Sequence, residues 1–411
     1  MRIAIAQRLT LAHGIRGGME TQAQALTTGL AARGHALLIL TAPLPDGRSA
    51  GEECGVPVRY VAPGSHRWYQ RRWWEACYRE LVQQHQQAPF DVLLSHSAGA
   101  LGYVERVACE LHLPCMVILH GTLAGELRTR LNDSATPRGI YRLMRFASRA
   151  PGMLARWRRV VDSVDRWIAV APQVAHDAAR EIGMPANRIS VIPNGIDTTR
   201  FQPDAEARAR TRRRLGIAAD APLLIASGRL EREKGFDTAI AAVTRLHNHW
   251  PELRLLIAGG GRDSARLETL ARPLGEAVRF VGHVPHAELA SILAAGDLYL
   301  MPTRCAEGLS LALIEALASG LPVLATRSGG EAIIDAGRTG ILLPPASPDA
   351  WADSIEHLLR HDRLRRAMGL LARQMAVARY SQERMVALSE AALMEAHDAW
   401  RLRRTGYHHA L

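Results

Sequence analysis

The sequence predicts an α/β protein of two domains, each built on a parallel sheet with helices on its faces. Three observations lead to this prediction. The chain has 411 residues, whereas a single domain typically has about 150, so more than one hydrophobic core is expected. Short apolar runs alternate with amphipathic segments in both halves, which is typical of parallel strands joined by helices. Between the halves, Pro193-Asn194-Gly195-Ile196-Asp197 has the composition of a turn and indicates an interdomain crossing.

The expected strands are the short apolar runs, taken in chain order. In the first half they are Arg2–Ala6, Ala36–Leu40, Asp91–Ser95, Cys115–Leu119 and Arg166–Val170. An Arg-rich helix is expected next, at Ala205–Leu215. The strands of the second half are expected at Leu223–Ser227, Arg254–Ala258, Val278–Val281, Leu298–Met301 and Pro322–Ala325. After Trp351 the sequence is expected to be helical to its end.

Composition excludes several classes of protein. Hydrophobic residues make up 48% of the chain and charged residues 22%, which excludes a wholly disordered or fibrous protein. The longest apolar stretches fall well short of the ~20 residues of a membrane-spanning helix. Met1–Ala6 turns polar too soon for a signal peptide, so a cytoplasmic location is expected. The five cysteines form no C-x-x-C pair and are expected to be packing residues.

The formal net charge of +11 favours an anionic partner. Of the 51 basic residues, only Lys234 is a lysine. The general preference for arginine says nothing about function. The position of the single lysine is informative, because it lies in the loop that best fits a phosphate site.

That loop, Gly228–Gly235, lies between an expected buried strand and the start of a helix. Arg229 and Lys234 stand five residues apart in it, and the amides and dipole of the helix N-terminus add to their charge. The glycines allow the backbone to approach oxygen atoms closely. The alternative is a solvated turn in which the two cations pair with Glu231 and Glu233. The placement of the single lysine favours the phosphate site.

A second segment, Glu307–Glu315, combines a loop with a helix expected over Leu309–Leu317. Glu307 precedes the helix, and Glu315 lies two turns inside it, where a carboxylate is costly unless it meets hydroxyls or a cation. Sugar hydroxyls suit it, because ionised carboxylates accept several hydrogen bonds. The amides of residues 308–311 are expected to face phosphate oxygens. The alternatives are a helix-dipole partner for Glu307 and a buried ion pair for Glu315.

The first half offers weaker candidates at the expected carboxyl edge of its sheet. Gly17 and Gly18 open a helix after the first strand, and His120 follows the strand Cys115–Leu119. Ligands of open parallel sheets bind at this edge. A plain turn explains the glycine pair equally well, and His120 is one of 17 histidines, most of which are bystanders. His96, at the same edge, is a weaker candidate than His120.

Several catalytic motifs are absent from the sequence. It contains no Asp-x-Asp at a strand end, no His, Cys and carboxylate cluster with metal-ligand spacing, and no P-loop. Divalent-metal phosphate chemistry and P-loop hydrolysis are therefore disfavoured, and no residue is assigned to a metal. A Gly-x-Ser-x-Gly elbow is also absent, which leaves an α/β hydrolase unsupported.

Taken together, these segments resemble the family-4 glycosyltransferases of the GT-B fold. In that fold two Rossmann-like domains with parallel sheets face each other across a cleft. The likeness runs from Gly17-Gly18-Met19-Glu20 through the 193–197 turn to Gly340. It is most specific at Gly228-Arg229 with Lys234-Gly235, and at the Glu307 and Glu315 pair continuing to Val323.

The resemblance implies the domain roles and the site residues. Residues 1–195 would form an acceptor-side domain and 196–380 a nucleotide-sugar-binding domain, with a C-terminal helix, about 381–411, packing back on the first. The implied catalytic residues are His120 and Glu307, which would face the transferred sugar, and Arg229 and Lys234, which would neutralise the donor diphosphate. Glu315 would bind the ribose hydroxyls. The other implied donor-binding residues are Gly17, Gly18, Gly228, Val284, Gly308, Leu309, Ser310 and Leu311.

The resemblance also implies the reaction. A retaining, metal-independent glycosyltransferase without a cofactor would move a hexose-type sugar from a nucleoside diphosphate sugar. The acceptor would be a glycolipid or a polysaccharide precursor of the cell envelope. The sequence departs from the family at Leu309-Ser310, which replaces the frequent Phe-Gly, but this change removes no charged ligand.

Two alternative functions remain open. Another GT-B enzyme, such as a sugar-nucleotide epimerase, would form its product without an acceptor. A nucleic-acid-binding protein would use the same positive charge. However, aromatic residues are only 5% of the chain and no nucleic-acid motif occurs, so no nucleic-acid partner is expected.

Two basic segments favour peripheral contact with the inner face of an anionic membrane that carries the acceptor. Residues 67–79 mix arginines with Trp68, Trp73 and Trp74, as interfacial anchors do. Over residues 138–159, arginines recur at helical spacing beside an apolar stripe that contains Ile140 and Met144. The alternative is that the tryptophans fill the core and the arginines cover it.

Overall fold

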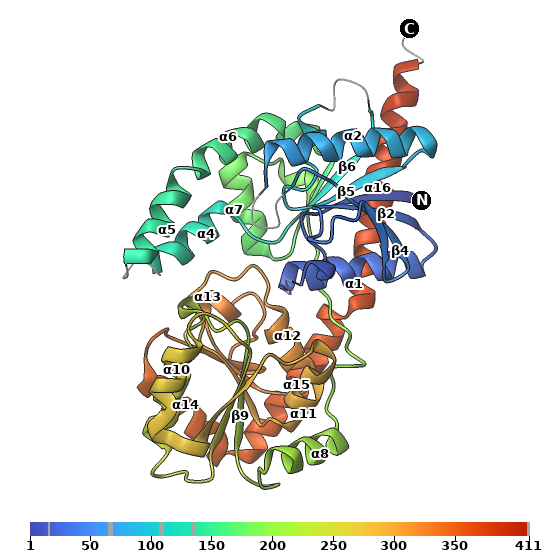
Figure 1. Ribbon diagram of the computed structural model, residues 1–411. Coiled ribbons are helices and arrows are strands. Elements are labelled where there is room, and N and C mark those ends of the chain that lie inside the picture. Colours follow the sequence, from blue (N-terminus) through green and yellow to red (C-terminus); the bar gives the residue numbers. More distant parts are fainter. Residues whose placement is uncertain (15–16, 65–68, 107–110, 133–136, 409–411) are drawn as a thin grey trace. The chain divides into compact units, whose positions relative to one another are not determined.

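The computed structural model describes residues 1–14, 17–64, 69–106, 111–132 and 137–408, and it divides into two compact units. The first unit comprises Met1–Ala124, Ala147–Gly195 and Gln382–Leu411. The second comprises Gly125–Phe146 and Ile196–Ser381. Residues 125–146, which the sequence analysis assigns to the first domain, therefore group with the second unit. Each unit is built on one sheet with helices around it (Figure 1).

The first unit contains an eight-stranded sheet in the order β3-β4-β2-β1-β5-β6-β7-β8. Its neighbouring strands are parallel except β3, which pairs antiparallel with β4 at one edge. The strand order reverses between β1 and β5, so the chain leaves these two strands toward opposite sides of the sheet. The strands are β1 (Arg2–Ala6), β2 (Ala36–Thr41), β3 (Ala50–Glu53), β4 (Val56–Tyr60), β5 (Val92–His96), β6 (Cys115–Leu119), β7 (Arg166–Ala169) and β8 (Ile189–Val191).

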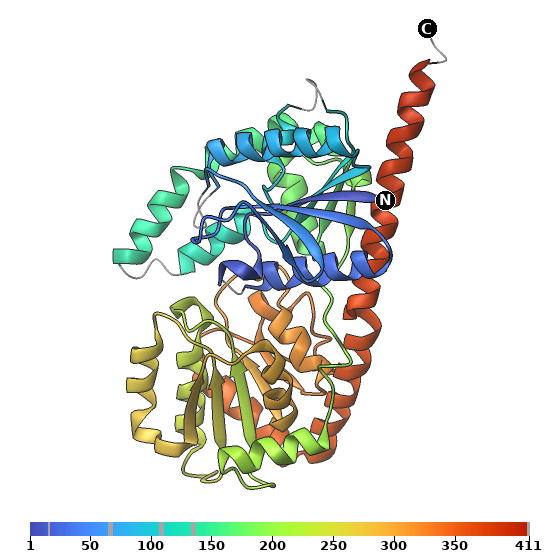
Figure 2. The ribbon, with the colours of Figure 1, turned by 45° about the vertical axis from the view of Figure 1, so that its right-hand side comes forward.

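Helices cover both faces of this sheet. Figure 2 shows α1 (Gly18–Ala32), in blue, on one side of the strands and α2 (Arg71–Gln87), in light blue, on the other. The C-terminal helix α16 (Gln382–His408) packs along α1, where Arg33 pairs with Glu390 at 2.5 Å. The other elements are α3 (Leu101–Val104), α6 (Ala150–Val160), α7 (Pro172–Ile182) and the 3-10 turns η1 (Leu11–His13), η2 (Val161–Ser163) and η3 (Ala186–Arg188).

The second unit contains a six-stranded parallel sheet in the order β11-β10-β9-β12-β13-β14. Its order reverses between β9 and β12. The strands are near-continuous apolar runs, because helices cover both faces of the sheet. They are β9 (Leu223–Ser227), β10 (Arg254–Ala258), β11 (Val278–Gly282), β12 (Leu298–Met301), β13 (Val323–Thr326) and β14 (Gly340–Leu343).

The helices of this unit close two apolar clusters, one on each face of the sheet. Successive residues of β9 alternate between them, with Leu224 in one cluster and Leu223 in the other. Its elements are α8 (Ala205–Leu215), α9 (Phe236–Leu246), α10 (Ser264–Ala271), α11 (His286–Ala295), α12 (Leu311–Ala318), α13 (Arg327–Gly330), α14 (Pro348–Arg360), α15 (Asp362–Tyr380), η4 (Arg232–Lys234), η5 (Arg272–Ala277) and most of α4 (Leu123–Asn132) and α5 (Pro137–Ala147).

A buried guanidinium connects α8 to the start of β9. Arg212 is 2% exposed, and its Nη2 donates to Asp297 at 2.8 Å. Its other nitrogens donate to backbone carbonyls, including those of Ala295 at 3.0 Å and Ala221 at 2.8 Å. Asp297 also accepts from the N–H of Leu223 at 2.8 Å. Because a buried charge requires paired and hydrogen-bonded surroundings, this network fixes α8 relative to β9.

The predicted α/β class is confirmed, and the expected strands agree with the observed ones to within one residue at either end. The sequence analysis does not predict β3, β4, β8 and β14. Three of these strands, β3, β8 and β14, lie at a sheet edge, and β3 and β4 lack a continuous apolar run. The strand β3, for example, reads Ala-Gly-Glu-Glu. Within the described part of the chain, none of the helices combines the length and the apolar composition that a membrane span requires.

The structure corrects part of the expectation about membrane contact. Trp73 and Trp74 are 1% and 3% exposed and pack inside the first unit, so their interpretation as interfacial anchors is wrong. They lie on the face of α2 that covers the core, where large rings bury the most apolar area. Trp68 lies outside the described residues. Residues 138–159 span two helices, α5 and α6.

Candidate active site

Two loops meet at the carboxyl edge of the second sheet. One follows β9 and contains Gly228–Gly235, and the other follows β12 and contains residues 302–310. The two strands are hydrogen-bonded neighbours, although the chain leaves them toward opposite sides of the sheet. In open parallel sheets, ligands bind at such a reversal of strand order. The topology therefore brings together the two segments that carry the strongest sequence signals.

Lys234 and Glu307 form an ion pair between these loops. Their side chains are 21% and 19% exposed, and Thr303 Oγ1 lies 3.5 Å from the same Glu307 oxygen. Burial disfavours the charged ammonium, but the carboxylate of Glu307 outweighs it, so the pKa of Lys234 is raised. Lys234 is therefore a fixed positive charge at the carboxyl edge of the sheet.

The backbone holds the two loops in register. Gly235 has a φ of 70°, and it faces the Pro302 carbonyl so closely that an added Cβ would collide with it. The carbonyl of Glu233 accepts a hydrogen bond from the N–H of Arg304 at 2.7 Å, and Thr303 Oγ1 lies 3.4 Å from that carbonyl. Both the dihedral angle and the close approach require glycine at 235, which positions Lys234 beside the second loop.

Arg229 lies at the start of the first loop, and its side chain is exposed. In the described part of the chain it forms no ion pair with a carboxylate, and Glu231 lies 3.9 Å from Arg262 instead. The positive charge of Arg229 lowers the pKa of Lys234 slightly against the larger effect of Glu307, so the two cations lie within electrostatic reach. The alternative of a turn in which Glu231 neutralises Arg229 is not what the structure contains.

Glu315 lies on α12 and is 4% exposed. One of its carboxylate oxygens lies 2.7 Å from Nε2 of His286, the first residue of α11. Burial raises the pKa of Tyr299 on β12, and the charges of Glu315 and Glu307 add to this effect. The sequence analysis leaves a buried pair open for Glu315 but does not identify His286, since nothing in the sequence relates α11 to α12.

The other predicted donor-binding residues of this unit lie beside these groups. Gly308, Leu309 and Ser310 are half-buried in the loop before α12, and Leu311 is the buried first residue of that helix. Because α12 begins at Leu311 with Ser310 as its N-cap, the expectation that Gly308 belongs to the helix N-terminus is wrong. Val284 is half-buried between β11 and α11. Gly228, with a φ of 142°, leads out of β9.

The predicted residues of the first unit lie at the carboxyl edge of its own sheet. Gly17 is the N-cap of α1 and Gly18 its first residue. His120 follows β6 directly, and His96 ends β5. Nδ1 of His96 lies 3.2 Å from Nε2 of His120, and the two rings stack with centroids 5.5 Å apart. The structure thus joins the favoured histidine to the one that the sequence ranks lower.

Burial fixes the protonation of this histidine pair. It lowers the pKa of His120 to about 4. The pKa of His96 is lowered well below its ordinary value by burial and by the neighbouring His120. Both rings are therefore neutral at pH 7, and each carries one N–H. Nε2 of His96 is buried without a partner in the described structure. Leaving this nitrogen unpaired costs less free energy if it is an unprotonated acceptor than if it carries an N–H. The proton of His96 is thus placed on Nδ1, which donates to Nε2 of His120. Because Nε2 of His120 then accepts, the proton of His120 lies on its Nδ1.

The described residues contain no group of three His, Cys, Asp or Glu side chains that is arranged to hold a metal ion. Cys77, Cys115 and Cys305 are buried free thiols, as expected of packing residues. Cys54 is exposed, so its interpretation as a packing residue is wrong. Cys109 lies outside the described residues.

Two family models match this chain. The model of glycosyltransferase family 4 matches residues 16–200, and the model of glycosyl transferases group 1 matches residues 221–361. Together they span most of the sequence. The chain belongs to the family-4 glycosyltransferases. The two matches include every residue that the sequence analysis assigns to the site of this glycosyltransferase.

Curated proteins similar to this chain match part or most of it. A GDP-mannose-dependent alpha-(1-6)-phosphatidylinositol monomannoside mannosyltransferase of Mycolicibacterium smegmatis is 37% identical over 203 residues, 47% of this chain and 53% of the relative. The chain thus spans about half the length of that relative. A D-inositol 3-phosphate glycosyltransferase of Kineococcus radiotolerans is 28% identical over 394 residues, 88% of this chain and 87% of the relative.

The fold of this chain is shared with solved structures. Sucrose-phosphate synthase from Thermosynechococcus elongatus superposes with a TM-score of 0.75 at 23% identity, covering 98% of this chain and 99% of that chain. At this identity, the likeness concerns the fold alone. The predicted GT-B fold is confirmed.

Proposed function

We propose that this glycosyltransferase moves a hexose from a nucleoside diphosphate sugar to a glycolipid or polysaccharide precursor, without a metal and with retention of configuration. One observation carries the proposal: Lys234 and Glu307, 73 residues apart, form an ion pair where the second sheet reverses its strand order. Arg229 adds an exposed guanidinium to the same loop, and Glu315 adds a buried carboxylate on the following helix. Two cations beside two carboxylates suit a ligand that combines a diphosphate with hydroxyl groups.

The cations act on the leaving group. As the glycosidic bond breaks, the diphosphate gains negative charge, which the Lys234 ammonium and the Arg229 guanidinium stabilise. The ammonium is already held by Glu307, and the close approach of Gly235 to Pro302 positions its loop, so little reorganisation accompanies the reaction. Removing one donor of this kind typically raises the barrier by ~3–4 kcal/mol.

The carboxylates act on hydroxyl groups. Lys234 occupies one oxygen of Glu307, and His286 occupies one oxygen of Glu315. The second oxygen of each carboxylate accepts hydrogen bonds, from the transferred sugar at Glu307 and from the ribose at Glu315. The hydroxyl-binding groups thus remain oriented by their protein partners when the donor is bound.

Retention follows from attack on the face that the diphosphate leaves. The ring partner of His120 is the neutral imidazole of His96, rather than a carboxylate suited to form a glycosyl intermediate. The departing phosphate accepts the proton of the acceptor hydroxyl as the new glycosidic bond forms. His120, protonated on Nδ1, donates a hydrogen bond to a sugar hydroxyl and carries no charge at pH 7.

The names of the two relatives guide the choice of substrates. One is named for GDP-mannose and a phosphatidylinositol monomannoside, and the other for inositol 3-phosphate. GDP-mannose is therefore the first donor to test, followed by other GDP-, UDP- and ADP-hexoses. Inositol 3-phosphate and a phosphatidylinositol glycolipid are the first acceptors.

The test of the proposed function is a transfer assay with and without acceptor, with the product anomer identified by NMR. We expect an acceptor-dependent product with the anomeric configuration of the donor, formed at an undiminished rate in the presence of a chelator. An inverted anomer would exclude retention, and loss of activity with chelator would exclude metal independence. A modified sugar nucleotide formed without any acceptor would indicate an epimerase instead.

We also propose that α5 contacts an anionic membrane that carries the acceptor. Ile140, Tyr141 and Met144 are exposed on this helix, beside Arg142 and Arg145. Exposed apolar side chains next to arginines are typical of helices that lie in a membrane interface.

Sedimentation with phosphatidylcholine vesicles that contain phosphatidylglycerol tests this contact. The double variant Ile140→Ser with Met144→Ser should bind several-fold less protein to the vesicles, since each apolar side chain contributes about 1–2 kcal/mol when it enters the interface. The matched control is Leu370→Ser, an exposed leucine of α15, and it should bind like the unmodified protein. Undiminished binding of the double variant would refute the role of α5.

A further inference from the structure

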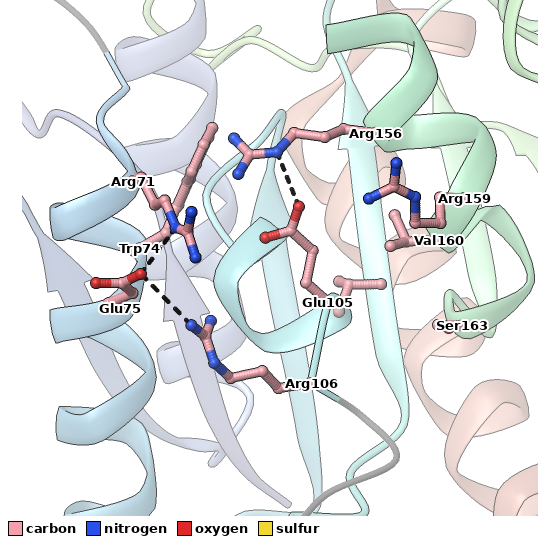
Figure 3. A pocket seen from close by; sticks show the side chains of 10 residues that line it. Arg71, Trp74, Glu75, Glu105, Arg106, Arg156, Arg159, Val160 and Ser163 are labelled. Atoms are coloured by element: carbon pink, nitrogen blue, oxygen red, sulfur yellow. Dashed lines mark hydrogen bonds and ion pairs between the residues drawn. The ribbon is translucent and has the colours of Figure 1, made fainter. Parts of the chain in front are cut away.

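A basic pocket of about 460 Å³ lies in the first unit among α2, α3 and α6. None of the residues assigned to the sugar donor lines it. Figure 3 shows the guanidinium groups of Arg71 from α2, Arg106 after α3, and Arg156 and Arg159 from α6 gathered around one space. The fold thus concentrates positive charge in a concave site that the proposed transfer reaction does not use.

The charges of the pocket do not balance. Its lining contains four arginines but only two carboxylates, those of Glu75 and Glu105. The lining therefore carries an excess of two positive charges. Such an excess is costly in a concave site unless a counter-ion reduces it, so the pocket favours an anion.

Protein contacts orient three of the four guanidinium groups. Glu75 lies 3.0 Å from Arg71 and 3.7 Å from Arg106. Arg156 pairs with Glu105 at 2.9 Å and lies over the ring of Trp74 at 5.0 Å. These contacts restrict side chains that otherwise lose much rotamer freedom when they bind a ligand. The pocket is thus a partly preorganised set of donors.

Arg159 supplies the fourth guanidinium. It is exposed, and it forms no ion pair with a carboxylate in the described residues. All of its donors are therefore available to a ligand, whereas Arg71 and Arg106 share one carboxylate.

We propose that this pocket binds a phosphomonoester dianion. A phosphomonoester carries a charge of about −1.5 to −2 at pH 7, which matches the excess of two positive charges. Its three terminal oxygens accept the paired N–H groups of arginines in the geometry that guanidinium favours. The volume lies within the range of roughly 300–1,000 Å³ of small-molecule sites, so it admits a small phosphorylated molecule. The same chemistry occurs in a free phosphate ester and in a lipid headgroup.

Calorimetric titration with glycerol 3-phosphate tests the free source. The double variant Arg71→Ala with Arg159→Ala should bind at least about tenfold more weakly, since it loses two charge-assisted contacts. Both residues are exposed and Glu75 keeps its contact with Arg106, so the fold is expected to survive. Circular dichroism and thermal unfolding verify this. The matched control is Arg79→Ala on the same helix, which is exposed and does not line the pocket, and its affinity should be unchanged.

Vesicles distinguish the lipid source. Phosphatidylcholine vesicles with phosphatidic acid, a phosphomonoester, are compared with vesicles of equal surface charge that contain phosphatidylglycerol, a phosphodiester. A headgroup would be identified as the ligand if the protein prefers vesicles with phosphatidic acid, if the double variant loses this preference, and if the Arg79→Ala protein keeps it. Glycerol 3-phosphate binding with the same pattern would identify a soluble ligand.

Two outcomes would overturn the proposal. One is that the protein neither binds glycerol 3-phosphate nor prefers phosphatidic acid. The other is that Arg79→Ala weakens binding as much as the double variant does, which would indicate diffuse surface charge. No sugar transfer is needed for these measurements, so their result is independent of the proposed function.

Discussion

Lys234 and Glu307 are 73 residues apart in the sequence and form an ion pair between two loops of the second unit. The pair depends on the close approach of Gly235 to Pro302, which brings the loops after β9 and β12 together. Because about four-fifths of each side chain is buried, the two charges interact in a partly dehydrated site and are less screened than surface charges. Removing either charge therefore leaves the other partly buried without its partner.

Lys234→Ala should lower turnover about a hundredfold or more, because it removes a preorganised cation from the leaving group. The fold should survive, since the loop backbone is held by contacts of Gly235 and Glu233. Steady-state kinetics with the best donor measure the effect. Arg232→Ala is the control, because Arg232 lies in the same loop with an exposed side chain, and its rate should stay near that of the unmodified enzyme. A near-normal rate for Lys234→Ala would exclude the assigned role.

Glu307→Gln should lower kcat about tenfold or more, because the amide keeps the shape of the carboxylate but loses its charge. Without that carboxylate, burial lowers the pKa of Lys234 instead of being outweighed. Lys234 of the variant should consequently lose its proton at a lower pH. The decline of activity at alkaline pH should therefore begin at a lower pH than in the unmodified enzyme. Glu331→Gln, an exposed glutamate paired with Arg327, is the matched control and should retain both rate and pH profile.

His96 should act as a positioning residue for His120. His96→Leu removes the hydrogen bond to Nε2 of His120. This variant should lower kcat about tenfold, which corresponds to the energy of roughly one hydrogen bond, with little change in the KM for the donor. His96→Asn, whose amide nitrogen takes the place of Nδ1, should restore part of the rate. Nitrogen NMR of the His120 ring should show the Nδ1 tautomer in the unmodified protein and a mixture in His96→Leu. Equal kcat values for the Leu and Asn variants would contradict this role.

Stability should fall as the pH decreases from 6.5 toward 4. Burial lowers the pKa of His120 from 6.5 to about 4, so between these values the unfolded chain binds a proton that the folded protein does not. Stability therefore rises with pH in this window, by at most about 3 kcal/mol for this group. Urea unfolding at several pH values measures the slope. His120→Asn should show a shallower slope than the unmodified protein, and identical slopes would refute the assignment.

Arg212→Ala should destabilise the second unit by about 3–5 kcal/mol, because it leaves Asp297 and several carbonyls without their buried partner. Arg212→Lys should recover only part of the loss, since one ammonium does not replace the planar fork. Chemical denaturation measures both changes. Arg210→Ala, an exposed arginine of the same helix, should change stability by less than about 0.5 kcal/mol. A loss of stability that is equal in both alanine variants would contradict the network.

The sequence alone predicts much of the fold because buried parallel strands are local signals. The runs at Leu223–Ser227, Arg254–Ala258 and Leu298–Met301 coincide with β9, β10 and β12 at both ends. Each contains four consecutive apolar residues, since both faces of the sheet are covered. The edge strand β3 escapes prediction because its composition, Ala-Gly-Glu-Glu, is that of a loop.

The sequence also identifies Lys234, Glu307 and Glu315 as candidates, because residue type and the neighbouring glycines are visible along the chain. The partners of these residues are not visible there. His286 lies 29 residues from Glu315, and His96 lies 24 residues from His120. Only the order of the strands decides which loops become neighbours, because hydrogen bonds between strands join segments that are distant in the sequence.

Protonation states and the basic pocket belong to the tertiary structure for the same reason. The pKa of His120 depends on its removal from water, and the excess charge of the pocket depends on helices that meet only in the folded unit. Local composition determined which segments form strands, helices and loops. Packing decided which side chains share a site and which charges they carry, because burial and electrostatic coupling act through space rather than along the chain.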